Sequence, residues 1–244
     1  MPRYRTVVFD CDSTLSAIEG ITELAGERRD ELVALTEAAM RGDVPLEQVY
    51  GRRLALVRPS RAQVDGLGGA YIRNLLPRAR EVVAALRQER IAVRIVAGGL
   101  RPAVLALARE LGVEDDAVAA VDVAFDAAGN YAGFDQGSPL AYAGGKRDVL
   151  ARWAPALPRP ILLVGDGATD LEARPVVDGF VAFAGVIERA AVAASADVVV
   201  RSRSLAPILA LALGEEPPRD PGARVVYDEG LTLLQREGIR IDPD

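Results

Sequence analysis

The stretch Val7-Val8-Phe9-Asp10-Cys11-Asp12-Ser13-Thr14 gives the first indication of both the fold and the chemistry of this chain. Residues 6–9 are β-branched or aromatic, which predicts a short buried strand, and two carboxylates follow it directly. Because side chains alternate along an extended chain, Asp10 and Asp12 share one side and Cys11 faces the other. A magnesium ion between the carboxylates would offset their repulsion and the cost of burying them. A turn in which Asp12 caps a helix is the alternative interpretation, and this stretch alone leaves both open.

The composition is that of a globular protein. With 244 residues, 50% of them hydrophobic, the chain is long enough for one large domain plus a smaller insert. The net charge of −6 and the lack of a dense basic run argue against nucleic acid as a partner. No apolar run reaches about 18 residues, and the first residues lack the apolar segment of a signal peptide. We therefore expect a cytoplasmic protein without a membrane partner.

The chain has no histidine and a single cysteine, Cys11. These counts exclude an internal disulfide, a multi-cysteine zinc site, imidazole metal ligands and serine–histidine or cysteine–histidine nucleophile pairs. Any catalysis has to use carboxylates, lysine, hydroxyl groups and a metal ion. We interpret Cys11 itself as a small buried residue that faces away from the site.

The sequence of residues 16–77 predicts a small all-helical insert. Their apolar residues keep helical spacing, and no segment among them reads as a convincing strand. Pro59 stands where a helix would begin, with Ser60 as its N-cap. The polar residues Glu19, Arg52 and Arg53 occur beside apolar ones, and on this pattern alone a solvated helix face is the favoured interpretation.

From Pro77 onward, strands and helices alternate. The expected strands cover residues 91–96, 117–123, 160–164, 179–183 and 197–200, with a hairpin over 125–134 around Gly129-Asn130. The expected helices cover residues 78–88, 101–111, 145–153, 188–194 and 205–213. Repeated strand–helix units with nearly continuous apolar strands predict a parallel sheet covered on both faces, which is the α/β class. Ligands bind such sheets beyond the carboxyl ends of the strands.

The sequence after Gly214 differs in composition from the preceding strand–helix region. Residues 215–221 read as a linker, and beyond them we expect a strand over residues 225–227 and a helix over residues 229–235. Their apolar residues predict a segment that docks either on the core or on a second copy of the chain. A homodimer is therefore one of two open arrangements.

Four groups of residues converge at the carboxyl edge of the predicted sheet. Asp10 and Asp12 end the first strand, Gly98-Gly99 ends the second, Lys146 begins a helix, and residues 165–170 end the fourth strand. A carboxylate can attack a phosphoryl group in line, and a second carboxylate can move the proton of the leaving oxygen. A magnesium ion, a lysine and the N–H groups of a glycine turn would stabilise the transferred charge.

With these motifs in place, the sequence closely resembles the phosphoserine phosphatases of the haloacid dehalogenase-like (HAD) superfamily. The match covers about residues 5–213 in the family's order and spacing. The stretches that carry it are Phe9-Asp10-Cys11-Asp12-Ser13-Thr14, Glu19-Gly20-Ile21-Thr22-Glu23-Leu24-Ala25, Arg53-Leu54-Ala55-Leu56, Gly98-Gly99-Leu100-Arg101, Tyr131-Ala132-Gly133-Phe134-Asp135, Gly144-Gly145-Lys146 and Gly165-Asp166-Gly167-Ala168-Thr169-Asp170.

The resemblance implies a fold and an activity. The fold would be a Rossmann-like parallel sheet core over residues 1–15 and 78–213. A helical cap would be inserted at residues 16–77, and residues 214–244 would form a C-terminal extension. The activity would be the magnesium-dependent hydrolysis of O-phospho-L-serine, in serine biosynthesis, through an aspartyl-phosphate intermediate.

The resemblance also implies residue roles, which replace the solvated-face interpretation of Glu19 and Arg53. Asp10 would be the nucleophile and Asp12 the general acid and base, with Lys146 neutralising the phosphoryl group. The metal would be held by Asp10, Asp166 and the main-chain carbonyl of Asp12, with Asp170 supporting the metal-bound water. Glu19 would bind the substrate ammonium and Arg53 its carboxylate, an arrangement that suits an amino acid phosphate. The remaining substrate contacts implied are Met40, Gly98, Gly99, Arg101 and Thr169.

Two positions depart from the family pattern. Ala97 stands where the family carries a serine or threonine before the glycine pair, and Gly185 leads into Val186 without the asparagine that members often carry. The missing hydroxyl at Ala97 predicts weakened catalysis. Two alternatives therefore stay open: a phosphatase or phosphotransferase acting on another small phosphomonoester, and a weakly active phosphoserine-binding sensor.

Overall fold

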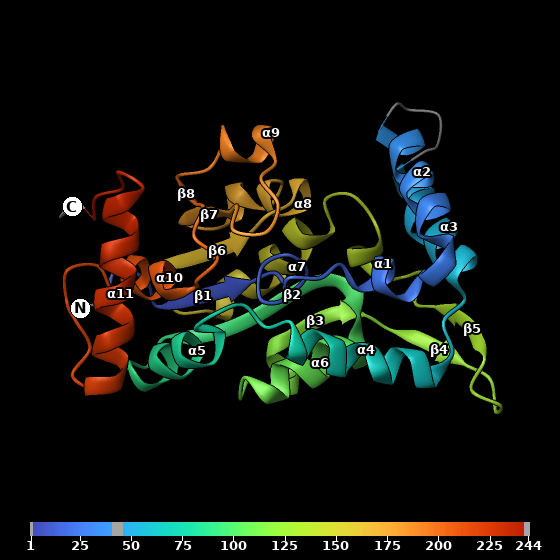
Figure 1. Ribbon diagram of the computed structural model, residues 1–244, viewed down its shortest axis with the longest axis horizontal. Coiled ribbons are helices and arrows are strands. Elements are labelled where there is room, and N and C mark those ends of the chain that lie inside the picture. Colours follow the sequence, from blue (N-terminus) through green and yellow to red (C-terminus); the bar gives the residue numbers. More distant parts are fainter. Residues whose placement is uncertain (1, 41–45, 242–244) are drawn as a thin grey trace.

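A six-stranded parallel sheet forms the centre of the molecule, as the computed structural model shows for residues 2–40 and 46–241 (Figure 1). Its strand order is β3-β2-β1-β6-β7-β8. The strands are β1 (Thr6–Phe9), β2 (Ala92–Leu100), β3 (Val118–Val121), β6 (Ile161–Gly165), β7 (Gly179–Phe183) and β8 (Val198–Val200). Neighbouring strands run parallel, so the predicted α/β sheet is confirmed.

Helices cover both faces of the sheet. They are α5 (Ala79–Gln88), α6 (Arg101–Glu110), α7 (Gly145–Trp153), α8 (Ala168–Leu171), α9 (Ala190–Ala193) and α10 (Ala206–Leu213). Short 3-10 turns occur at η1 (Gly26–Arg28), η2 (Asp115–Ala117), η3 (Pro139–Ala141), η4 (Ala154–Ala156) and η5 (Arg174–Val176). Strand β1 shows the two layers: Val7 and Phe9 pack in one apolar cluster, while Val8 packs in the other with Leu150 of α7. Burial of both faces explains the continuous apolar sequence of the strands.

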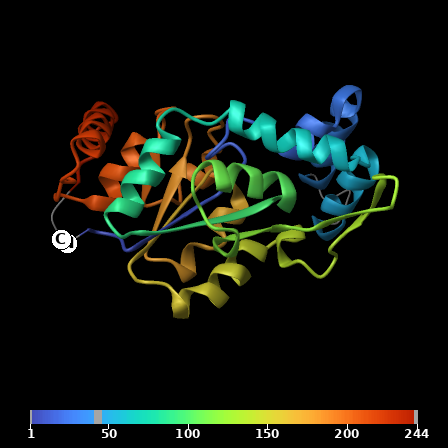
Figure 2. The same ribbon diagram turned by 90° about the horizontal axis from the view of Figure 1, so that it is seen from below.

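The segment between β1 and α5 is helical, as predicted. It holds α1 (Gly20–Leu24), α2 (Arg29–Met40), α3 (Leu46–Val57) and α4 (Arg61–Arg73), and we call residues 16–77 the helical cap. Ser60 is the N-cap of α4: its Oγ accepts from Gln63 N at 3.3 Å, and Gln63 Oε1 accepts from Ser60 N at 2.8 Å. This reciprocal capping box confirms the predicted helix start. Helix α4 also packs along α6 of the core, so close that a Cβ at Gly68 would lie 2.7 Å from the Ala106 Cβ (Figure 2).

The predicted hairpin consists of β4 (Val123–Phe125) and β5 (Tyr131–Phe134), which pair antiparallel. It reaches from the sheet to the helical cap (Figure 2). Arg61 N, at the start of α4, donates to Gly129 O in the hairpin loop at 2.9 Å. The rings of Tyr50 and Phe134 meet edge to face, with centroids 5.3 Å apart. The hairpin therefore packs against the cap.

The C-terminal part forms one helix, α11 (Pro221–Arg236), so the predicted strand over residues 225–227 is wrong. Asp220 caps this helix, accepting from Ala223 N at 2.9 Å, and Pro221 occupies its first turn, where proline is favoured. Helix α11 packs on α10 and α5 (Figure 1). Tyr227 Oη donates to Gly214 O at 2.6 Å. Docking on the core is thus confirmed, and an arrangement as a homodimer stays a prediction.

Among the described residues, no helix combines the length and the apolar character that a membrane crossing requires.

Candidate active site

An open cavity of about 430 Å³ lies between the carboxyl edge of the sheet and the helical cap. Strands β1, β2 and β6 are neighbours, with Phe9 level with both Ile95 and Val164, so the residues that follow these strands meet at one edge. The predicted site residues that line this cavity are Asp10, Asp12, Glu19, Arg53, Gly98, Lys146, Asp166 and Thr169. The topology therefore brings together groups that lie far apart in the sequence.

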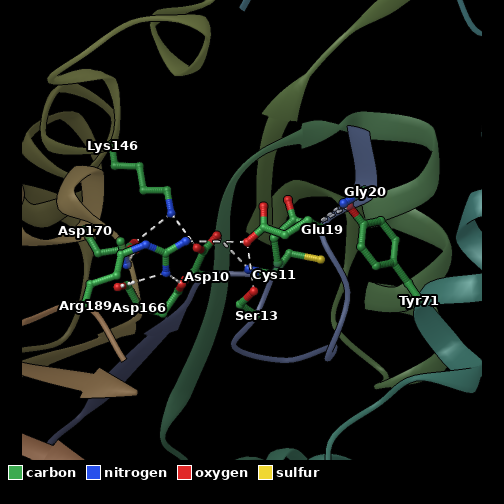
Figure 3. Close-up of polar contacts among 12 residues, drawn as sticks. Asp10, Cys11, Ser13, Glu19, Gly20, Tyr71, Lys146, Asp166, Asp170 and Arg189 are labelled. Carbon is green, nitrogen blue, oxygen red and sulfur yellow. Dashed lines mark hydrogen bonds and ion pairs between the residues drawn. The ribbon is translucent and has the colours of Figure 1, made fainter. Parts of the chain in front are cut away.

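Asp10 and Lys146 form the centre of the site (Figure 3). Asp10 Oδ1 accepts from Cys11 N at 2.7 Å, and Lys146 Nζ lies 2.8 Å from Asp10 Oδ2 and 2.7 Å from Asp170 Oδ1. All three charged side chains are buried. Burial by itself lowers the pKa of Lys146, but the carboxylates of Asp10 and Asp170 outweigh it and raise that pKa above its usual value. Lys146 is therefore a permanent positive charge beside Asp10.

Three buried carboxylates offer a place for a metal ion. Asp10, Asp166 and Asp170 each present an oxygen within 4.8 Å of the other two. Such an all-oxygen set fits a hard divalent cation. Gly165 leaves room for one of these carboxylates, since a Cβ at this position would lie 2.2 Å from the Asp170 carboxyl carbon. The carboxylate of Asp12 is not one of these three, which leaves its main-chain carbonyl as the predicted contribution.

Asp12 is held by the helical cap. Its Oδ1 accepts from Gly20 N at 2.8 Å and from Tyr71 Oη at 2.7 Å. Burial raises the pKa of Asp12 to about 7, assisted by the carboxylates of Glu19 and Asp10, and the two hydrogen bonds oppose that rise. A carboxyl group that titrates near neutral pH suits proton transfer in both directions. Tyr71 was not predicted, because it follows Asp12 by 59 residues and no local pattern links them.

The glycine pair is part of a strand and does not form the predicted turn. Strand β2 continues through Gly98 and Gly99 to Leu100, with a shift in pairing register between Val96 and Leu100. A Cβ at Gly99 would lie 3.2 Å from Tyr71 Oη and 3.5 Å from Asp12 Oδ2, so this position sits beside the acid/base candidate. The expected strand end at residue 96 is therefore wrong by four residues, and the irregular backbone takes the place of a turn.

The structure places Ala97 in an apolar environment, whereas the sequence predicted a position beside the phosphoryl group. Ala97 is fully buried and belongs to the apolar cluster that also contains Cys11. It is not among the cavity-lining residues. Cys11 itself is buried and faces the same cluster, as its interpretation as a packing residue requires.

The helical cap contributes charged groups to the opposite wall of the cavity. Glu19 Oε1 accepts from Ser13 Oγ at 2.8 Å. Arg53, on α3, lines the same cavity, and its Nη2 lies 3.5 Å from Thr22 Oγ1. The solvated-face interpretation is thus wrong for Glu19 and Arg53, whereas Arg52 does lie on the exposed side and contacts Gln48. The Met40 side chain, predicted to line the pocket, lies outside the described residues.

Arg189 is a site residue that the sequence reasoning missed. It comes from the segment between β7 and α9, forms an ion pair with Asp166, and places Nη2 3.7 Å from Glu19 Oε1 (Figure 3). Applying the strand-end rule to β7, as it was applied to β1, β2 and β6, would have pointed to this segment. Arg189 thus connects the carboxylate cluster of the core with the cap.

Arg101 was predicted to bind substrate, and the structure corrects this prediction. Its Nη1 donates to Val118 O at 2.9 Å, and its Nε lies 3.8 Å from Asp122 Oδ1. These partners belong to β3 and to the residue after it, and Arg101 does not line the cavity. Because its donors are directed to the sheet edge, Arg101 ties α6 to β3.

Comparisons with known proteins agree with this geometry. A sequence profile of the haloacid dehalogenase-like hydrolases matches residues 4–175. The phosphoserine phosphatase of Bos taurus is 39% identical over 186 residues, which is 75% of this chain and 83% of that protein. A solved phospho-aspartyl intermediate analogue of phosphoserine phosphatase has a TM-score of 0.70 at 26% identity, with 84% of this chain and 97% of that chain covered. A substrate-bound phosphoserine phosphatase complex has a TM-score of 0.70 at 25% identity, with 85% and 97% covered.

Proposed function

The chain belongs to the haloacid dehalogenase-like hydrolases, and from that premise we propose that it hydrolyses O-phospho-L-serine to L-serine and phosphate. One observation carries the choice of substrate. A single cavity is lined by Asp10 and Lys146 from the core and by Glu19 and Arg53 from the cap. The first pair complements a phosphoryl group, and the second pair complements an ammonium and a carboxylate. An amino acid phosphate carries all three groups.

The first half of the reaction transfers the phosphoryl group to Asp10. A carboxylate oxygen of Asp10 forms a bond to phosphorus while the bond from phosphorus to the serine oxygen breaks. The protonated carboxyl of Asp12 gives its proton to that leaving oxygen, so L-serine departs neutral at its hydroxyl. Lys146, 2.8 Å from Asp10 Oδ2, holds a positive charge beside the transferred group throughout.

The second half releases phosphate. Asp12, now a carboxylate, takes a proton from a water molecule whose oxygen attacks phosphorus, and the bond between phosphorus and Asp10 breaks. Asp10 is restored as a carboxylate and Asp12 as an acid, so atoms and charges balance over the cycle. Gly20 N and Tyr71 Oη keep Asp12 Oδ1 fixed, which leaves its other oxygen for both proton transfers.

The buried carboxylates fit a magnesium ion. Asp10, Asp166 and Asp170 would hold it, with the Asp12 carbonyl as a further predicted ligand. When bound, magnesium supplies positive charge that stabilises the negative phosphoryl oxygens. Lys146 keeps the Asp170 carboxylate in place at 2.7 Å.

Substrate recognition is divided between the two walls of the cavity. On the core side, Gly98, Gly99 and Thr169 are the proposed neighbours of the phosphoryl group. On the cap side, Glu19 takes the ammonium and Arg53 the carboxylate. Arg189 shares Glu19 with the substrate ammonium, so the substrate has to compete with this arginine for the carboxylate.

Phosphate release from a panel of esters tests the proposal. The full chain with magnesium should hydrolyse O-phospho-L-serine with a kcat/KM at least tenfold above phosphoethanolamine and glycerol phosphate, and a chelator should stop the reaction. Preference for an ester without a carboxylate would refute the substrate assignment and favour another phosphomonoester. Binding of phosphoserine without hydrolysis would favour the phosphoserine-binding sensor.

A further inference from the structure

Tyr50 lines the cavity, and its hydroxyl is a buried polar group without a role in the proposed reaction. Tyr50 lies on α3 three residues before Arg53, so the two side chains share one side of the helix, and both line the cavity. The Tyr50 ring packs against Phe134 of β5, with centroids 5.3 Å apart and ring planes at 63°. The hairpin thus fixes the ring in the cap wall.

Two buried polar atoms in this wall have no hydrogen-bond partner among the described residues: Tyr50 Oη and Arg53 Nε. The contact of the Arg53 guanidinium with Thr22, from Nη2 to Oγ1, is long at 3.5 Å. Buried polar atoms in folded proteins nearly always have partners, so each exception calls for an explanation. Two neighbouring exceptions at the wall of a substrate cavity indicate that a ligand supplies the partner.

Both groups are hydrogen-bond donors. Arginine has donors only, and burial raises the pKa of Tyr50 far above its usual value, so its hydroxyl keeps its proton at neutral pH. A bond from Arg53 Nε to Tyr50 Oη would still leave the Tyr50 proton without an acceptor. The missing partner is therefore an acceptor with at least two lone-pair sites and negative charge. A carboxylate has this chemistry.

We propose that Tyr50 determines specificity: its hydroxyl, together with Arg53, binds the carboxylate of the substrate. This inference rests on the proposed function, because it assigns the acceptor to the amino acid end of O-phospho-L-serine. The phosphoryl group is taken by Asp10 and Lys146 of the core, which leaves the carboxylate for the cap. Phosphate esters without a carboxylate leave both donors unpaired, and the enzyme discriminates against them for that reason.

Tyr50→Phe removes the hydroxyl and keeps the ring on Phe134. A hydrogen bond to a charged group corresponds to roughly 10- to 150-fold in binding, so KM for O-phospho-L-serine should rise by that factor. The value of kcat should stay within about twofold, because the bond is made equally before and during the reaction. The kcat/KM for phosphoethanolamine should not change. Tyr131→Phe is the matched control, because Tyr131 lies on β5 outside the cavity-lining set, and neither substrate should respond to it.

A double variant identifies the shared partner. In an Arg53→Ala background, Tyr50→Phe should change KM for O-phospho-L-serine by less than about twofold, because the carboxylate is already released. Full additivity of the two changes would overturn the proposal. So would an equal effect of Tyr50→Phe on both substrates, or no effect on O-phospho-L-serine.

Binding calorimetry separates this inference from the proposed function. With magnesium present, the Asp10→Asn variant should bind O-phospho-L-serine, and adding Tyr50→Phe should weaken that binding by the same roughly 10- to 150-fold. If the unmodified chain does not hydrolyse O-phospho-L-serine while Tyr50→Phe weakens its binding selectively, the proposed function fails and the role of Tyr50 stands. If hydrolysis is efficient and Tyr50→Phe leaves the binding affinity unchanged, only the proposed role of Tyr50 is refuted.

Discussion

Gly165→Ala tests how closely the backbone of β6 approaches the active site. A Cβ at Gly165 would lie 2.2 Å from the Asp170 carboxyl carbon, whereas ordinary contact begins at 3.4 Å, so the two groups would have to separate by about 1.2 Å (3.4 − 2.2). Asp170 is fully buried and is bound to Lys146 Nζ at 2.7 Å and to Gly167 N at 3.1 Å. A displacement of about 1 Å can cost 100-fold in rate, so kcat/KM should fall by roughly that factor. Overpacking should also cost about 1–3 kcal/mol of unfolding free energy.

The assay combines phosphate release with chemical denaturation, and Gly66→Ala supplies the control. A Cβ at Gly66, on the exposed side of α4, meets nothing within 4 Å. The same substitution there should therefore raise the unfolding free energy by about 0.5–1 kcal/mol and leave kcat/KM unchanged. A Gly165→Ala enzyme with kcat/KM within threefold of the original, and with unchanged stability, would refute this reasoning about Asp170.

Three further predictions follow from the site. Asp10→Asn should abolish turnover with retention of the fold, as measured by phosphate release and circular dichroism, and beryllofluoride with magnesium should form a stable adduct with the unmodified chain but not with this variant. Arg53→Ala should lower kcat/KM for O-phospho-L-serine by a factor that corresponds to about 2–5 kcal/mol, while kcat/KM for phosphoethanolamine changes little. An equal loss on both esters would make Arg53 structural. Ala97→Ser would raise kcat/KM if its hydroxyl reached the phosphoryl group, but because Ala97 is fully buried in an apolar cluster we expect no gain and a loss of about 1–3 kcal/mol in stability. A gain above threefold would contradict the structural assignment of Ala97.

The sheet and one edge of the site were predictable because their signals are local. Strand β7 has the predicted bounds, since its five buried residues form one continuous run that begins directly after Asp178. The placement of Asp10 and Asp166 in one cavity follows from parallel strands whose carboxyl ends share an edge. Neither inference needs any knowledge of side-chain packing.

The features that escaped prediction depend on tertiary contacts. Residues 225–227 look like a strand locally, yet Val226 and Tyr227 are buried against the core within one helix that starts at the Asp220 cap. Tyr71 reaches Asp12 only because α4 packs along α6. Arg101 follows the glycine pair and reads as a substrate ligand, but the nearby Val118 carbonyl offers its guanidinium a partner at the sheet edge.

The two carboxylates with proposed catalytic roles are held by different parts of the molecule. The core holds Asp10, through Cys11 N at 2.7 Å and Lys146 Nζ at 2.8 Å. The cap holds Asp12, through Tyr71 Oη at 2.7 Å and Gly20 N at 2.8 Å. Any displacement of the cap therefore moves the partners of Asp12, the proposed acid/base group, and leaves those of Asp10, the proposed nucleophile, in place. Because the cap also carries the groups proposed to bind the amino acid end of the substrate, the contacts that recognise the substrate and the contacts that orient Asp12 belong to the same helices.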